Sequence, residues 1–81
     1  MRPTTLTAMT FGERLALARR RRKLTQKALA QRLGVAPSEV HRLERGLVQD
    51  PHGSRVVALA EALGVTTDYL LRGLGELPPP A

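Results

Sequence analysis

Four polar side chains stand close together near the middle of the chain: Ser38, Glu39, His41 and Arg42. If this stretch is an α-helix, with about 100° per residue, Ser38, His41 and Arg42 point away from the apolar face that contains Val40. An Arg fork can donate to O6 and N7 of guanine, and a Glu carboxylate can accept from N4 of cytosine. The pattern therefore predicts a helix whose exposed face reads base edges in a DNA groove.

Each of these four side chains also has a simpler interpretation. Arg42 can bind a phosphate or face solvent, and Ser38 can reach a base or a phosphate with little discrimination. The Glu39 carboxylate can instead reach back to the N–H of Ala36 or favour the helix dipole. His41 is a candidate for phosphate contact as well as for solvation.

Catalysis and metal binding fit the same residues poorly. Ser38 and His41 lie one turn apart on an exposed helix, and no carboxylate is placed to orient the imidazole as a hydrolytic triad requires. The chain has no Cys and only two His, so a thiolate zinc site is impossible and a structural metal site is not expected. We therefore expect no enzymatic activity, no metal and no cofactor.

A second group of polar residues is suited to the DNA backbone rather than to the bases. Backbone contacts give affinity without reading sequence, and Lys, Arg and Gln side chains supply many of them. The candidates are Gln26, Lys27, Arg32 and Arg45. The basic run at residues 19–23 is a less specific signal, because five adjacent positions spread around a helix and cannot all face one partner.

Helical periodicity and capping residues predict an all-α fold of five helices. Thr10, Thr25 and Thr66 are good N-caps, Glu13 completes a capping box with Thr10, and Gly34 is suited to end the second helix. The first expected helix begins after Thr10, the second runs from Thr25 to Leu33, and the third begins at Ala36-Pro37. The fourth runs from about residue 53 to 63, and the fifth from 67 to about 72. The expected organisation is an arm at 1–9, a domain at 10–73 and a Pro-rich tail at 74–81.

One carboxylate is expected to point toward the core. Glu44 lies only about 40° from Val40 on the helical wheel, and an unpaired carboxylate there is expensive. It needs a cation, and Arg19, at the edge of the apolar stripe of the first helix, is the best candidate. We therefore predict an Arg19–Glu44 salt bridge.

Charge is distributed unevenly along the 81 residues. Through Gly46 there are 11 Lys and Arg against three Glu, a net charge of +8, whereas the remainder carries −2. Such asymmetry points to a polyanion, nucleic acid before membrane, although it is also compatible with a solubilising surface. No apolar run approaches the roughly 20 residues of a membrane span, and the first residues lack a signal peptide's apolar segment. A cytoplasmic protein is expected.

The pattern of residues resembles the lambda-repressor-like, Cro-type helix-turn-helix family. It includes Leu24-Thr25-Gln26, Leu33-Gly34-Val35 and Leu43-Glu44-Arg45-Gly46. The resemblance implies a DNA-reading unit made of the second and third helices, with the third in the major groove, and a dimer on a near-palindromic operator. It also implies the Arg19–Glu44 bridge and a phosphate contact by Gln26. At Ala36 and Pro37 the chain departs from the family's usual hydroxyl cap and polar base reader.

Two further expectations concern partners. The small core and the apolar residues Val65, Tyr69, Leu70 and Leu74 suggest a homodimer interface. A different class of function also fits: the chain can be a protein-interaction module, such as the antitoxin of a toxin–antitoxin pair, that grips a partner with its arm or tail. We expect a transcriptional regulator, with double-stranded DNA as its main partner.

Overall fold

The computed structural model describes residues 9–48 and 51–74, and within these ranges the chain forms five helices and no strand. The predicted all-α fold is therefore confirmed. The helices are α2 (Phe11–Arg21), α3 (Gln26–Leu33), α4 (Pro37–Glu44), α5 (Gly53–Leu63) and α6 (Thr67–Arg72). The expected arm and tail fall on residues outside those described, apart from Met9 and Leu74.

Local chemistry determines where these helices begin. The hydroxyl oxygens of Thr10, Thr25 and Thr66 each accept an N–H from the first turn of the helix that follows. The Glu13 side chain accepts the Thr10 N–H in return, and these hydrogen bonds with Thr10 hold the pKa of the Glu13 carboxyl below its usual value. The predicted capping box is confirmed.

The start of α4 differs from the others. Ala36 has no side-chain oxygen, and Pro37 occupies the first helical position, where its missing N–H costs nothing. The beginning of α4 therefore depends on the turn before it. In that turn Gly34 has φ 71°, a conformation that favours glycine, and the N–H of Val35 donates to the carbonyl of Ala30 at 3.0 Å.

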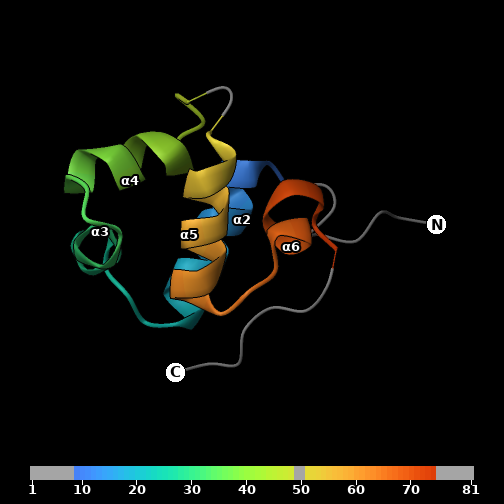
Figure 1. Ribbon diagram of the computed structural model, residues 1–81, viewed down its shortest axis with the longest axis horizontal. Helices are drawn as coiled ribbons and strands as arrows, with labels where there is room; N and C mark the ends of the chain where they lie inside the picture. The colour runs from blue at the N-terminus through green and yellow to red at the C-terminus, as the bar shows by residue number, and fades with distance from the viewer. Residues whose placement is uncertain (1–8, 49–50, 75–81) are drawn as a thin grey trace.

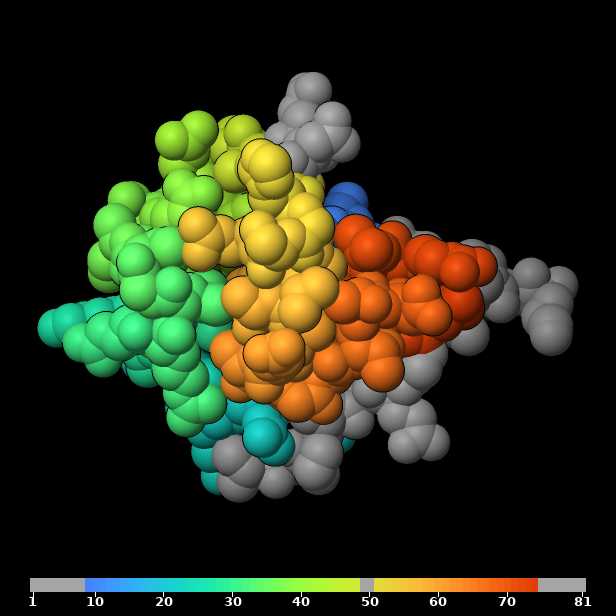
Figure 2. Space-filling view, viewed as in Figure 1, coloured from blue at the N-terminus to red at the C-terminus, as the bar shows by residue number. Residues whose placement is uncertain are grey.

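The helices surround one apolar core. α5 lies across the middle of the molecule, with α3 and α4 on one side, α6 on the other and α2 behind it (Figure 1). The space-filling view shows the surface of α5 between these two groups (Figure 2). The core is formed by buried side chains from all five helices: Leu15, Ala18, Leu29, Ala30, Val40, Leu43, Val56, Leu59, Ala60, Leu63, Tyr69 and Leu70.

The last helix corrects one expectation. Tyr69 and Leu70, which we expected at a dimer interface, are fully buried in the core, and Val65 is half-buried against it. Because a helix turns about 100° per residue, the consecutive residues Tyr69 and Leu70 share the core face, and Leu71 lies outside it. Leu71 and Leu74 are the exposed apolar residues of this segment, at 53% and 43%. A surface contact between two copies can therefore use Leu74 from the expected set, but not Tyr69 or Leu70.

A close approach of two backbones sets the position of α2 against α4. A Cβ atom placed on Gly12 would lie 2.3 Å from the carbonyl oxygen of Glu44 and 2.7 Å from that of Leu43. Only a residue without a side chain fits there. Because Gly12 is near the start of α2, this contact brings the first turn of α2 against the last turn of α4.

Candidate nucleic-acid interface

α4 presents a polar face to solvent because its apolar face is held in the core. Val40 is fully buried and Leu43 nearly so. The exposed residues of the helix and its C-cap are Pro37, Ser38, His41, Arg42 and Arg45. The structure thus places Ser38, His41 and Arg42 on the surface of one helix, as the sequence predicts.

Glu39 is placed differently from the other three expected base readers. It is half-buried and lines a hollow with Leu43, Val48, Pro51, His52 and Arg55. This hollow lies between α4 and the start of α5. Among the described residues no hydrogen bond joins the Glu39 carboxylate to the Ala36 N–H, so the alternative role as a cap is not seen either.

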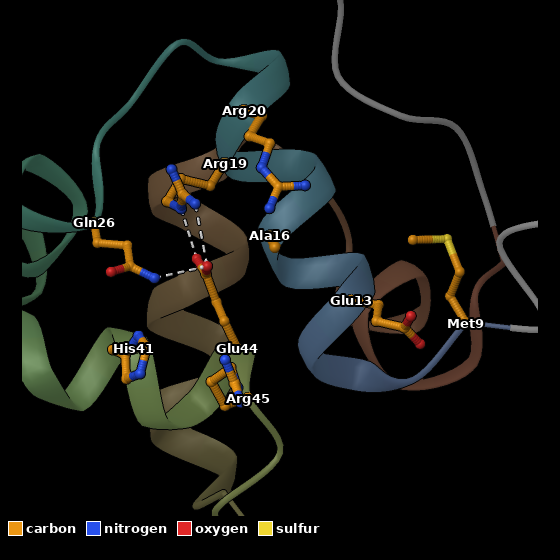
Figure 3. A pocket seen from close by; sticks show the side chains of 9 residues that line it. All are labelled: Met9, Glu13, Ala16, Arg19, Arg20, Gln26, His41, Glu44 and Arg45. Carbon is orange, nitrogen blue, oxygen red and sulfur yellow. Dashed lines mark hydrogen bonds and ion pairs between the residues drawn. The ribbon is translucent and has the colours of Figure 1, made fainter.

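The predicted pairing of Arg19 with Glu44 is present, and it includes a third residue. Arg19 Nε donates to Glu44 Oε2 at 2.6 Å and Arg19 Nη2 to Glu44 Oε1 at 3.1 Å, with the two side chains only 12% and 6% exposed. The Gln26 amide donates to the same Oε1 at 3.0 Å (Figure 3). The network therefore joins α2, the start of α3 and the end of α4.

This network orients the amide of Gln26. Arg19 is itself held by a hydrogen bond from Nη1 to the carbonyl of Leu24 at 2.8 Å, next to the turn before α3. A Gln amide nitrogen carries two N–H groups, and Glu44 accepts one of them. The second N–H, at the positive end of α3, is available for an anion.

The four expected phosphate binders do not gather at one place. Gln26 and Arg45 line the same hollow between α2 and α4, and Lys27 is exposed on the first turn of α3. Arg32 lies on the other side of α3, where its guanidinium donates to the carbonyl of Ala62 at 3.4 Å and lines a hollow with residues of α5. Arg32 thus does not line the hollow that Gln26 and Arg45 share.

The described part of the chain offers no helix that is long and apolar enough to cross a bilayer. Residues 9–48 and 51–74 also hold no group of three or more His, Asp or Glu side chains arranged as metal ligands would be.

The family model described as Helix-turn-helix matches residues 15–70, which is more than half of the chain and contains α3 and α4. The chain belongs to the helix-turn-helix family. The resemblance to its lambda-repressor-like branch, predicted from the sequence, is confirmed by the relatives of this helix-turn-helix domain.

Two relatives are similar in sequence over most of this chain. Repressor protein C2 of Salmonella phage P22 is 36% identical over 63 residues, covering 78% of this chain and 29% of the phage protein. The transcriptional repressor RghR of Bacillus subtilis is 36% identical over 67 residues, covering 83% of this chain and 50% of RghR. The chain therefore spans half or less of the length of these two relatives.

Two solved structures share the helix-turn-helix fold. The P22 c2 repressor in complex with a synthetic operator has a TM-score of 0.76 and 35% identity, covering 82% of this chain and 98% of the other. SinR, a master regulator of biofilm formation solved in complex with DNA, has a TM-score of 0.71 and 26% identity, covering 75% of this chain and 97% of the chain in that structure.

Sequence reasoning missed one buried residue of this helix-turn-helix domain. Arg14 is only 5% exposed; its guanidinium donates to the carbonyls of Leu70 and Leu71, both at 2.9 Å, and to that of Met9. Leu70 and Leu71 lie in the last turn of α6, where a cation is favourable. The available signal was its spacing, because position 14 lies one turn from both Phe11 and Ala18, on the apolar stripe of α2.

Proposed function

We propose that this chain is a sequence-specific regulator of transcription that binds double-stranded DNA and acts as a repressor. α4 lies in the major groove, and the chain binds as a dimer on a near-palindromic operator. The observation that carries the proposal is the exposed polar face of α4, with Ser38 and Arg42 projecting from a helix whose other face is locked in the core. Two solved relatives of the same fold are in complex with DNA.

In this proposal two residues recognise the base sequence. Arg42 donates its planar fork to a guanine, and Ser38, at the start of α4, contacts a neighbouring base edge or phosphate. Glu39 and His41 are weaker candidates for base contacts, because Glu39 is half-buried toward α5 and His41 lines the hollow beside α2.

Backbone contacts hold α4 in register. Gln26 and Lys27 at the start of α3 and Arg45 at the end of α4 bind phosphates of the DNA backbone beside the groove. Arg32 has the weakest support in this group, since its guanidinium is directed to Ala62.

Gel shifts on DNA from upstream of the protein's own gene, and on random DNA, test the proposal at two salt concentrations. We expect a preference for the upstream DNA that persists at the higher salt, because nonspecific binding loses affinity more steeply with salt than base contacts do. Equal affinity for both DNAs at both salt concentrations would reject sequence-specific regulation.

The dimer is supported by the exposed apolar side chains Leu71 and Leu74 at the end of α6. Sedimentation at high micromolar concentration tests it, and a monomer there would argue against it. The alternative function, a protein-interaction module such as an antitoxin, would use the arm at 1–9 and the tail at 74–81, of which the structure describes Met9 and Leu74. An intracellular, non-enzymatic protein is part of the proposal.

A further inference from the structure

Several basic side chains line a hollow between α2 and α4. The proposed function assigns these side chains no common ligand. It encloses about 380 Å³ and is lined by residues of α2, α3 and α4. Arg20 comes from α2, His41 from α4 and Arg45 from the C-cap of α4, and all three are exposed. Figure 3 shows them around the Arg19–Glu44–Gln26 network.

The acidic groups of the hollow are already engaged. Glu44 accepts hydrogen bonds from Arg19 and Gln26, so its charge is compensated within the protein. Glu13 accepts the N–H of Thr10 at the opposite end of α2, and it lies beside Met9, on the side of the hollow away from Gln26 (Figure 3). The part of the hollow between Arg20 and the end of α4 therefore has a positive potential.

The wall of the hollow leaves room for a ligand group. Ala16 lies one turn before Arg20 on the same face of α2, and it is a buried residue that lines the hollow. A larger side chain there would project into the space between the two helices. The second N–H of Gln26 lies at the same hollow, so neutral and charged donors surround one small volume.

We propose that Arg20, His41 and Arg45 hold one backbone phosphate of the DNA in this hollow, together with the free N–H of Gln26. The inference rests on the proposed function and extends it, because it makes α2 a DNA-contacting helix. Guanidinium groups can bind a phosphate through two parallel hydrogen bonds. A phosphate gripped from both α2 and α4 sets the depth and angle at which α4 enters the groove. In this arrangement His41 contacts the backbone and not a base.

The test uses a short DNA duplex of random sequence, the full chain and four variants: Arg20→Gln, Arg45→Gln, the double variant and Lys23→Gln. Lys23 is the matched control, since it belongs to the same basic run, is exposed and does not line the hollow. We expect about tenfold weaker binding for Arg20→Gln and for Arg45→Gln. The Lys23→Gln variant should lose much less, because it changes only the general potential.

The double variant decides whether the two arginines share a phosphate. If they do, its loss of affinity is clearly smaller than the product of the two single losses, and the salt slope falls by about one per copy of the chain and not by two. Thermal melting of each variant checks that the fold is intact. Losses that multiply would overturn the shared phosphate, and so would a loss for Arg20→Gln no greater than for Lys23→Gln.

The role of His41 has its own readout. His41→Gln should weaken binding by the same factor on random DNA and on the preferred DNA, because a phosphate contact carries no sequence information. A loss confined to the preferred DNA would return His41 to the base readers. If the unaltered chain binds no DNA, the proposed function itself fails; if it binds and only the Arg20 and Arg45 results disagree, the phosphate site alone fails.

Discussion

Two hydrogen bonds link Tyr69 and its neighbour Leu70 to Arg14 in the core. The Tyr69 hydroxyl donates to the Arg14 carbonyl at 2.7 Å, and the Arg14 guanidinium donates to the carbonyl of Leu70 at 2.9 Å. The first bond runs from α6 to α2, and the second from α2 to α6. Both groups are buried, so water cannot replace either bond at low cost. This pair fastens the short last helix to the rest of the domain.

Tyr69→Phe should lower the free energy of unfolding at neutral pH by about 1 to 2 kcal/mol, because it removes the buried hydrogen bond from the Tyr69 hydroxyl to the Arg14 carbonyl. Burial raises the pKa of the Tyr69 phenol above its usual value of 10.0, although the Arg14 charge lowers it in part. The stabilising contribution is therefore complete below pH 10 and is lost as the pH rises from there toward the folded-state pKa.

Tyr69 is the only tyrosine, and the chain has no tryptophan, so the ultraviolet absorbance of tyrosinate reports its ionisation directly. The absorbance midpoint should lie above pH 10 and coincide with alkaline unfolding followed by circular dichroism. The Tyr69→Phe variant should show a weaker loss of stability over the same pH range. A phenol that titrates near pH 10 in the folded protein would contradict the burial argument.

Gly12→Ala should destabilise the domain, since the new methyl group would clash with the backbone of Glu44 and Leu43. Forcing α2 away from α4 costs about 1 to 3 kcal/mol, typical of overpacking in a close contact. Gly53→Ala is the matched control, because Gly53 begins α5 and nothing lies within 4 Å of its added Cβ. It should be neutral or stabilising by up to about 1 kcal/mol. Urea denaturation measures both, and equal effects would refute the close approach.

Glu44→Gln should lower the free energy of unfolding by about 3 kcal/mol, because it leaves the nearly buried Arg19 charge without its partner. The exposed pair between Arg72 and Asp68, at 3.8 Å, provides the comparison. Arg72→Gln should cost less than about 0.5 kcal/mol, as surface pairs are screened by water and salt. Chemical denaturation at low and high salt separates the two pairs, since only the exposed one should lose its contribution at high salt.

Arg42→Ala should weaken binding to the preferred DNA by about 1 to 3 kcal/mol and relax the preference at one base pair. Lys27→Ala should lower affinity on every sequence and reduce the salt slope by about one. Selection of bound sites from randomised DNA, followed by titrations at several salt concentrations, checks both. Equal losses for Arg42→Ala on preferred and random DNA would remove Arg42 from the base readers.

The helix ends could be predicted because they depend on neighbours in the sequence. The capping hydroxyls of Thr10, Thr25 and Thr66 act within three residues, and the positive φ of Gly34 is a property of that residue. The Arg19–Glu44 pair could also be predicted, because wheel geometry turns Glu44 inward and few cations can reach it. These inferences need only local geometry and the cost of a buried charge.

Other features could not be assigned without knowing which helices pack together. Arg14 lies on the apolar stripe of α2. Its charge can be buried only because its guanidinium binds carbonyls at the end of α6, with Leu70 lying 56 residues later in the chain. Tyr69 and Leu70 are buried in the core and not at the expected dimer interface, because six residues of helix do not show which face meets the core. Arg32 and Glu39 stay candidates, but contacts with α5 direct them away from the other DNA-binding candidates.

The sequence by itself therefore determined the all-α class, the helix boundaries and the polar face of α4, since these follow from spacing and capping within each helix. It also determined the Arg19–Glu44 pair, since an inward-pointing carboxylate requires a cation. Only the tertiary structure decided the buried role of Arg14, the burial of Tyr69 and the joining of Arg20, His41 and Arg45 around one hollow. The physical reason is that no cost of a buried charge marks these partners in the sequence, and their distances depend on how the apolar faces pack around α5.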